Sequence, residues 1–257
     1  MKKILIASLA SAVSIITHGV QANSLDISVI GTISAASCTP NAAGGGVVDY
    51  GFIKPDTLAD KGPTVLSVKT IGFTINCDAP TNVAIRASSN RMSTTTDIKG
   101  PESVVGSSIV NAELIAAGFG QNMPFGQSKV SQPTVVGLGA SSGKNIGGYL
   151  LNLPPSLVSL DGVPATNKYY TVGNTPNYST KWIKESSSLT TGNGHSLFTT
   201  DGAYFAYGVN SEATAPSSFT QLSGTLLVQA YITDKSNLDL SSPVNLNGSS
   251  TVELYYF

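Results

Sequence analysis

Two cysteines, Cys38 and Cys77, constrain the fold of this chain more than any other residues, because each lies at the end of a strand-like run. The first run covers residues 31–38 and is followed by three consecutive glycines and a short β-branched segment, residues 47–50. The second run, residues 71–77, alternates apolar and polar side chains, which is the period of a strand with one buried face. A bond between the cysteines would join two long strands, and the other strands would build on that pair.

The first 22 residues have the pattern of a secretory signal peptide. Lys2 and Lys3 precede an apolar stretch, residues 4–16, and Ala22 ends a small-residue site of the kind that a signal peptidase reads. The apolar stretch is short for a bilayer span, and no later apolar stretch has membrane length. We therefore expect residues 1–22 to be removed and the mature chain to be exported to the periplasm, the cell surface or both, without a membrane span.

The charge balance argues against electrostatic binding of nucleic acid or membranes. Loss of Lys2 and Lys3 reduces the 14 basic side chains to 12, against 15 acidic ones, so the mature net charge is near −3. Only 11% of the residues are charged, against roughly 25% in an average domain. This low charge, with abundant Gly, Ser and Thr, favours an exported β-sandwich. About 235 mature residues suffice for one large β domain or two small ones.

The two cysteines are expected to form a disulfide, because exported chains commonly pair their cysteines. The loop between Cys38 and Cys77 holds about 40 residues, for which the chain-entropy model gives a stabilisation of roughly 4 kcal/mol. A metal site is the weaker alternative, since it needs more thiols or histidines and His195 is the one histidine left after signal removal. No metal or cofactor is expected.

Residues 23–30 directly follow the predicted cleavage site. Leu25, Ile27 and Val29 alternate with polar residues, which predicts a strand with one apolar face. Two interpretations are open: an ordinary first strand of the sheet, or an extension that leaves its own domain and inserts into another.

Most of the remaining chain predicts strands rather than helices. Asp161-Gly162 is a candidate hairpin turn, residues 78–80 are expected to end a strand, and residues 111–117 fit either a helical turn or a strand. No segment has a sustained helical stripe, so the expected class is all-β. The expected strands are residues 47–50, 64–76, 82–87, 149–153, 169–172, 181–183, 203–208, 224–232 and 251–257.

Both ends of the chain resemble a chaperone–usher pilin subunit. A glycine lies seven residues before the first cysteine, a valine–aspartate–x–glycine segment follows, and a second cysteine closes an apolar strand. The far end is similar to the last two strands of such subunits and has a tyrosine next to last. The matching elements are Gly31, Cys38, Val48-Asp49-Tyr50-Gly51, residues 73–77, residues 224–232, residues 251–257 and Tyr256.

The chain also departs from a typical pilin in three ways. It is longer, with the surplus between about residues 88 and 215, its extension 23–30 is short, and Gly248 lies closer to the C-terminus than usual. In these respects it resembles a subgroup of larger fimbrial-like exported proteins filed under a domain of unknown function (number eleven-twenty). Residues 136–139 and 143–149 resemble that subgroup as well.

The resemblance implies one pilin-like domain, residues 31–257, with an immunoglobulin-like β-sandwich that lacks its last strand and has one disulfide and enlarged middle loops. A neighbouring chain completes such a sandwich by donor-strand complementation. Here the resemblance implies a structural pilus subunit or fimbrial-like protein with a part in cell adhesion. Its partners would be a periplasmic pilus chaperone, neighbouring subunits and an outer-membrane usher. The donor residues would be Leu25, Ile27 and Val29, and the C-terminal strand at the edge of the groove would contribute Val252, Leu254 and Tyr256.

A serine hydrolase is a weaker hypothesis. Residues 139–143 match the G-x-S-x-G pattern around Ser141, and Asp161 and His195 follow in a suitable chain order. That motif needs a strand running into a helix, and no helical pattern follows Ser141. No pair of carboxylates stands out for acid–base chemistry, so we expect no enzymatic activity.

A self-complete periplasmic β-sandwich that binds a carbohydrate or a protein without polymerising is the main alternative. It predicts a stable monomer whose terminal strand pairs on both sides within its own chain. Aromatic rings could form a sugar platform, although packing in a core or an interface is more common for such residues. The rings concerned are Trp182, Tyr169, Tyr170, Tyr178, Tyr204 and Tyr207.

Overall fold

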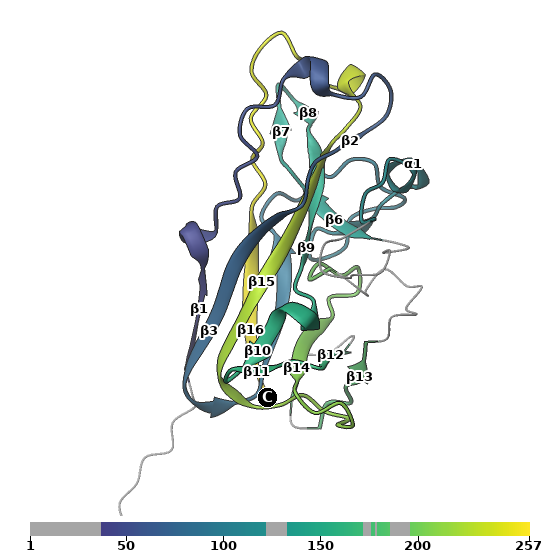
Figure 1. Cartoon of the computed structure of the whole chain (residues 1–257). Coiled ribbons are helices and arrows are strands. Elements are labelled where there is room, and N and C mark those ends of the chain that lie inside the picture. The colour runs from purple at the N-terminus through teal and green to yellow at the C-terminus, as the bar shows by residue number, and fades with distance from the viewer. Residues whose placement is uncertain (1–36, 122–132, 172–175, 178, 186–195) are drawn as a thin grey trace, which may run out of the picture. The chain divides into compact units, whose positions relative to one another are not determined.

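The computed structural model describes residues 37–121, 133–171, 176–177, 179–185 and 196–257 (Figure 1). Residues 36–257 form one compact unit. Its described part consists of antiparallel strands joined by loops and short helices, with one disulfide. The predicted all-β class is therefore confirmed.

The described part of the unit has two large sheets and a separate two-stranded hairpin of β7 (Ala140–Ser141) and β8 (Lys144–Asn145). The strands of the larger sheet are β1 (Cys38–Ala42), β2 (Thr64–Val65), β3 (Lys69–Thr81), β5 (Ser108–Ile109), β6 (Thr134–Gly137), β9 (Gly147–Asn152), β10 (Val158–Leu160), β11 (Val163–Pro164) and β15 (Phe219–Ile232). Those of the smaller sheet are β4 (Val83–Ser89), β12 (Asn167–Thr171), β13 (Ile183–Lys184), β14 (Tyr204–Gly208) and β16 (Ser250–Tyr256).

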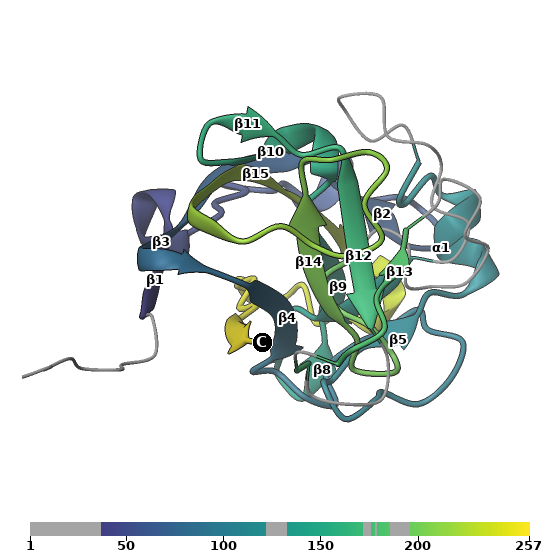
Figure 2. The same cartoon turned by 90° about the horizontal axis from the view of Figure 1, so that it is seen from below.

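The order of the strands makes β3 and β15 the centre of the larger sheet. This sheet runs β1-β3-β15-β9-β6-β5, and the smaller one runs β13-β12-β14-β4-β16. Figure 2 shows β3 and β15 in one layer and β4 and β14 in the other. Both layers contribute to one apolar core, which makes the unit a β-sandwich.

The alternation of residues along β3 and β15 explains which faces form the core. Phe73 and Ile75 on β3 and Leu222 on β15 are buried, while their neighbours in sequence are more exposed; from Leu226 onward, β15 is buried on both faces. Each such side chain contributes about 1.5–3 kcal/mol when it is fully buried. The middle of the chain, where the sequence analysis located the surplus length, also enters the sandwich, because β9, β12 and β14 belong to it.

The passage from β3 to β4 differs from the sequence prediction. Residues 78–80 were expected to end the strand, but β3 continues to Thr81. The register between β3 and β15 shifts between Phe219 and Gln221, and this irregularity accommodates Pro80, which has no N–H for a ladder bond. Asn82 alone separates β3 from β4, so the chain crosses from one sheet to the other within a single residue.

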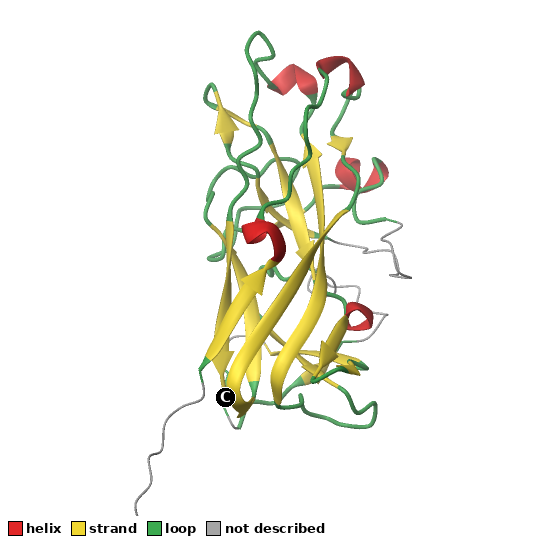
Figure 3. Cartoon of the chain, turned by 60° about the vertical axis from the view of Figure 1, so that its left-hand side comes forward, coloured by secondary structure: helices red, strands yellow, loops and turns green. Residues whose placement is uncertain are grey.

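Short helices and tight turns connect the strands (Figure 3). Helix α1 (Ala112–Ala116) settles the open choice at residues 111–117, because the Asn111 side chain accepts a hydrogen bond from the Leu114 N–H and caps the helix. Asp161 and Gly162 have φ of 49° and 80° between β10 and β11, which confirms the predicted hairpin turn. The 3₁₀ turns are η1 (Ala43–Gly46), η2 (Pro55–Thr57), η3 (Pro155–Leu157) and η4 (Lys235–Asn237). None of the helices in the described ranges is long and apolar enough to cross a membrane.

Candidate strand-binding cleft

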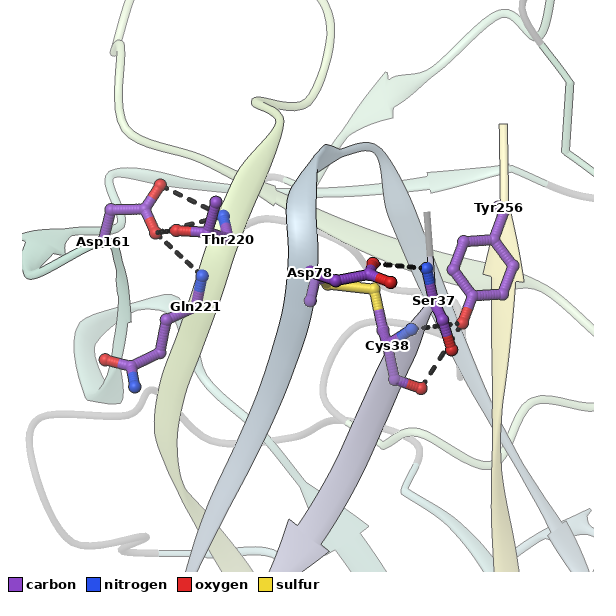
Figure 4. Close-up of a disulfide and its surroundings, with 8 residues drawn as sticks. Ser37, Cys38, Asp78, Asp161, Thr220, Gln221 and Tyr256 are labelled. Carbon is purple, nitrogen blue, oxygen red and sulfur yellow. Dashed lines mark hydrogen bonds between the residues drawn. A yellow bond between two sulfur atoms is a disulfide. The ribbon is translucent and has the colours of Figure 1, made fainter. Parts of the chain in front are cut away.

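The predicted disulfide is present and holds β1 against β3 (Figure 4). Cys38 and Cys77 lie directly opposite each other, with their Cα atoms 4.0 Å apart. Next to the bridge, the Ser37 N–H donates a hydrogen bond of 2.6 Å to Asp78 Oδ1. β1 therefore has a covalent anchor at its first residue.

The outer edge of β1 faces away from β3. The Asp78 N–H donates to the Ser37 carbonyl, so residues 37 and 78 form a hydrogen-bonded pair and Cys38 occupies the alternate position. By this alternation, the N–H and C=O of Cys38 and the C=O of Pro40 point outward. Proline fits here because its missing N–H removes no bond to β3. Among the described strands, β1 pairs with β3 alone.

β16 has a similar free edge on the opposite sheet. The Asn90 N–H donates to the Ser249 carbonyl and the Phe257 N–H donates to the Asn82 carbonyl, so odd-numbered residues of this stretch bond to β4. The even-numbered residues Val252 and Leu254 therefore direct their N–H and C=O groups away from β4. No other described strand pairs with that edge.

The side chains of β16 alternate as the sequence indicated. Val252 and Leu254 are half-buried and pack against the main core. Glu253 lies on the other face, where its carboxylate pairs with Arg86 at 2.6 Å. Tyr255 lies on that outer face too, with its ring centroid 4.5 Å from that of Tyr204.

A cleft of about 1080 Å³ is lined by residues of β1 and β16, by irregular segments and by core strands. One wall consists of residues 40–53, and the other consists of residues 238–252. Phe52 in the first wall is 87% exposed, and Val47, which precedes the lining residue Val48, is 73% exposed; both values are unusually high for large apolar side chains. The core side chains that line the cleft are Ile71, Phe73, Tyr149, Leu151, Leu226 and Val228, so the cleft opens directly onto the core of the sandwich.

The prediction of a strand at residues 47–50 is wrong. This segment forms no ladder with any described strand. A side chain fixes it instead: the Tyr50 hydroxyl donates to the Val228 carbonyl at 3.1 Å and accepts from the Ala230 N–H at 3.1 Å. The sequence showed the alternation of Val48 and Tyr50, but it did not show that Tyr50 would form part of the cleft wall.

Replacement of Tyr50 with phenylalanine is expected to lower the free energy of unfolding by about 1–3 kcal/mol, because two backbone groups of β15 lose their partner. Burial raises the pKa of Tyr50 to about 12. Since this pKa is raised in the fold, the contribution of Tyr50 is complete below the pKa of an unfolded tyrosine, near 10, and is lost as pH rises through about 12. Urea unfolding of Tyr50→Phe and of the parent between pH 7 and 12 measures both effects, with Tyr255→Phe as the control. Equal stability at pH 7 would contradict the prediction.

The third predicted edge residue, Tyr256, lies beyond the residues that line the cleft, beside Cys38. Its hydroxyl accepts a hydrogen bond from the Cys38 N–H at 3.0 Å and lies 3.4 Å from the Cys38 carbonyl, to which it donates. Figure 4 shows the ring on β16 leaning across to Cys38 on β1. The two free edges are thus bridged at the disulfide end.

The predicted donor residues, Leu25, Ile27 and Val29, lie outside the described residues, as do the predicted signal peptide and Gly31. Their roles stay predictions.

The aromatic side chains considered as a sugar platform do not share one open face. Tyr169, Tyr204 and Tyr207 are buried, and Tyr178 lies outside the described residues. The Tyr207 hydroxyl donates to the Leu153 carbonyl inside the sandwich. Trp182 lines a separate cleft of about 770 Å³, and its ring lies 4.8 Å from that of Phe257.

The serine motif lies in a β-hairpin. Ser141 ends β7 (Ala140–Ser141), and the turn at Ser142 and Gly143 leads directly into β8 (Lys144–Asn145). A nucleophile elbow instead runs from a strand into a helix. Asp161 is engaged elsewhere: its carboxylate accepts hydrogen bonds from Thr220 and Gln221, and the bond from the Thr220 hydroxyl is the main reason that its pKa is lowered. His195 lies outside the described residues.

Comparison with known proteins gives matches whose names state no activity. Residues 27–150 match the family described as "Protein of unknown function (DUF1120)", the family of the subgroup that the sequence resembled. The chain is 28% identical over 242 residues to the "Uncharacterized protein YhcF" of Escherichia coli (strain K12), which covers 91% of this chain and 90% of that protein. It is 31% identical over 100 residues to the "Protein GltF" of the same organism, a match that spans 36% of this chain and 39% of that protein. No solved structure matches. The chain is thus similar along nearly its whole length to the first of these two proteins, and its disulfide fits export to an oxidising compartment.

Proposed function

We propose that this protein is a non-enzymatic structural subunit or fimbrial-like protein of a chaperone–usher pilus, completed by a strand from another chain. One observation supports the proposal above the others. β1 and β16 each have a ladder partner on one side only among the described strands, and both line a cleft that opens onto the apolar core. An extended peptide in this cleft would pair with the free backbone groups of Val252 and Leu254 and cover the core side chains beneath it.

The proposed occupant is residues 23–30 of a second copy of the chain. Leu25, Ile27 and Val29 present one apolar face in that segment. Burial of these three side chains would contribute on the order of 5–9 kcal/mol, in addition to ladder hydrogen bonds. Before assembly, a strand of a periplasmic chaperone would fill the same cleft, and an outer-membrane usher would exchange it for the segment of the next subunit. The proposed locations are the periplasm and the cell surface, where a fibre would have a part in adhesion.

Peptide binding tests the proposal. The mature chain with Leu25→Ser, Ile27→Ser and Val29→Ser supplies an acceptor without its own donor, and a synthetic peptide of residues 23–31 supplies the strand. The midpoint of thermal unfolding is expected to rise with peptide concentration, corresponding to about 2.7 kcal/mol at one hundred times the dissociation constant. A peptide with the same three serines should have no effect.

The alternative function predicts a different result in the same assay. A self-complete sandwich would show no shift with either peptide. It would also remain a stable monomer whose yield does not change when a periplasmic pilus chaperone is co-expressed. Co-purification with the chaperone and a shift with the native peptide alone would instead support the pilus subunit.

A further inference from the structure

The Tyr256 hydroxyl, on β16, satisfies both backbone groups that Cys38 directs away from β3. The Cys38 N–H donates to it at 3.0 Å, and the hydroxyl donates to the Cys38 carbonyl at 3.4 Å (Figure 4). A strand lying beside β1 would use these same two groups for its ladder. One side chain therefore occupies the pairing position of β1 nearest the disulfide.

The next pairing position on β1 is incomplete for another reason. Pro40 follows at the next outward-facing position and has no N–H to donate. The next N–H that the alternation directs into the cleft is that of Ala42, at the far end of β1. On the opposite edge, Val252 and Leu254 offer complete N–H and C=O pairs. A ladder at the disulfide end is therefore available on β16 up to Leu254, and beyond it the Tyr256 side chain crosses to Cys38.

We propose that Tyr256 is a register stop for the strand that enters this cleft. The inference rests on the proposed function and specifies how the accepted strand is positioned. A slip of one residue turns the apolar face of a strand outward and is strongly opposed. A slip of two residues keeps the apolar face inward, so side-chain burial discriminates against it poorly. The bridge from Tyr256 to Cys38 blocks such a slip toward the disulfide, because the slipped strand would need the groups that the hydroxyl already holds.

Amide hydrogen exchange, read by NMR on the mature chain with Leu25→Ser, Ile27→Ser and Val29→Ser, tests this role. The probe is the synthetic peptide of residues 23–31. Without peptide, the Cys38 amide is expected to exchange about tenfold more slowly than in the same chain carrying Tyr256→Phe, because the hydroxyl bond is lost there. Tyr255→Phe, one residue away on the outer face, is the matched control and should leave the Cys38 amide unchanged.

Peptide binding then separates a stop from a merely structural bond. In the parent, the peptide should slow exchange at Val252 and Leu254 and leave Cys38 as it was. In Tyr256→Ala, where both the bond and the ring are removed, the peptide should also slow exchange at Cys38, because the bound strand now extends to it.

Three results would overturn the inference. Equal exchange at Cys38 in the parent and in Tyr256→Phe, both without peptide, would show that the Tyr256 hydroxyl does not accept a hydrogen bond from the Cys38 N–H. A fast Cys38 amide in the peptide complex of Tyr256→Ala, with Leu254 protected, would show that the register is set elsewhere while the proposed function stands. Absence of any peptide effect at Val252 and Leu254 in all variants would remove the proposed function, and the stop with it. If Tyr256→Ala does not fold, Tyr256→Phe serves for the bound-state comparison, with slowed exchange at Cys38 as the supporting result and unchanged exchange as the opposing one.

Discussion

Replacement of Glu185 with glutamine is expected to lower the free energy of unfolding by about 3–5 kcal/mol at pH 7, because it leaves the ammonium group of Lys168 buried without a counter-charge. Lys168 Nζ and Glu185 Oε1 lie 3.7 Å apart, and the side chains of Lys168 and Glu185 are 1% and 9% exposed. Lys168 points into the sandwich, where its Nζ lies 4.2 Å from the centre of the Phe205 ring. Burial lowers the pKa of Lys168 and raises the pKa of Glu185, while their mutual attraction opposes both shifts. Urea unfolding of the purified variant measures the loss.

The double replacement Lys168→Met and Glu185→Leu is expected to recover the stability of the parent or exceed it by about 1–4 kcal/mol, because no charge then remains to be desolvated. The ion pair of Lys235 and Asp60, 2.6 Å long and exposed at Asp60, provides the control. Asp60→Asn should give no measurable change, since solvent screens such a pair. A loss in Glu185→Gln no larger than in this control would contradict the prediction and would indicate that the buried pair is neutral in the fold.

Simultaneous replacement of Cys38 and Cys77 with alanine is expected to lower the free energy of unfolding by about 4 kcal/mol. The bridged residues are 39 positions apart, and their cross-link restricts the unfolded chain accordingly. The native state loses an anchor as well, because β1 pairs with β3 alone among the described strands and forms part of one cleft wall. Chemical denaturation of the double variant and of the reduced parent should agree.

The same double variant is expected to lose affinity for the peptide of residues 23–31 more than Tyr50→Phe does. Tyr50 fixes a later part of that wall through β15, whereas the disulfide fixes Cys38, the first residue of β1, just ahead of the wall. A double variant that unfolds within about 1 kcal/mol of the parent would contradict the stability prediction. Unchanged peptide affinity would show that β1 keeps its place without the bridge.

Alternation along single segments predicted strands that overlap β3, β4, β9, β12, β14, β15 and β16, because the period of two decides which side chains reach the core. The predicted strand 64–76 is divided between β2 and β3. Alternation placed Val252 and Leu254 on the inner face of β16 and Glu253 outside, as the structure shows. It failed at residues 47–50, whose pattern is that of a strand but which pair with no described strand. A strand needs a partner edge, and one segment of sequence does not encode where that edge lies.

The resemblance placed a groove beside residues 251–257, but the irregular walls of the cleft and the buried ion pair were beyond the reach of the sequence for a related reason. The cleft walls include irregular segments, residues 40–53 and 238–252, whose approach depends on the packing of both sheets. From the sequence alone, a lysine such as Lys168 is expected at the surface. Only its position opposite Tyr207 in β14 shows that it faces inward. The disulfide was predictable, because two cysteines in an exported chain leave one intramolecular pairing.

The position of the disulfide has a mechanical consequence. Any tension on the segment before Ser37 enters the folded unit at Cys38, the first residue of β1. From there it passes through the sulfur atoms straight into β3, a 13-residue strand that is paired along most of its length with β15. The hydrogen bonds of the short strand β1 carry little of that load. A chain pulled by its leading segment would therefore resist through the centre of its larger sheet, and β1 would not peel away first.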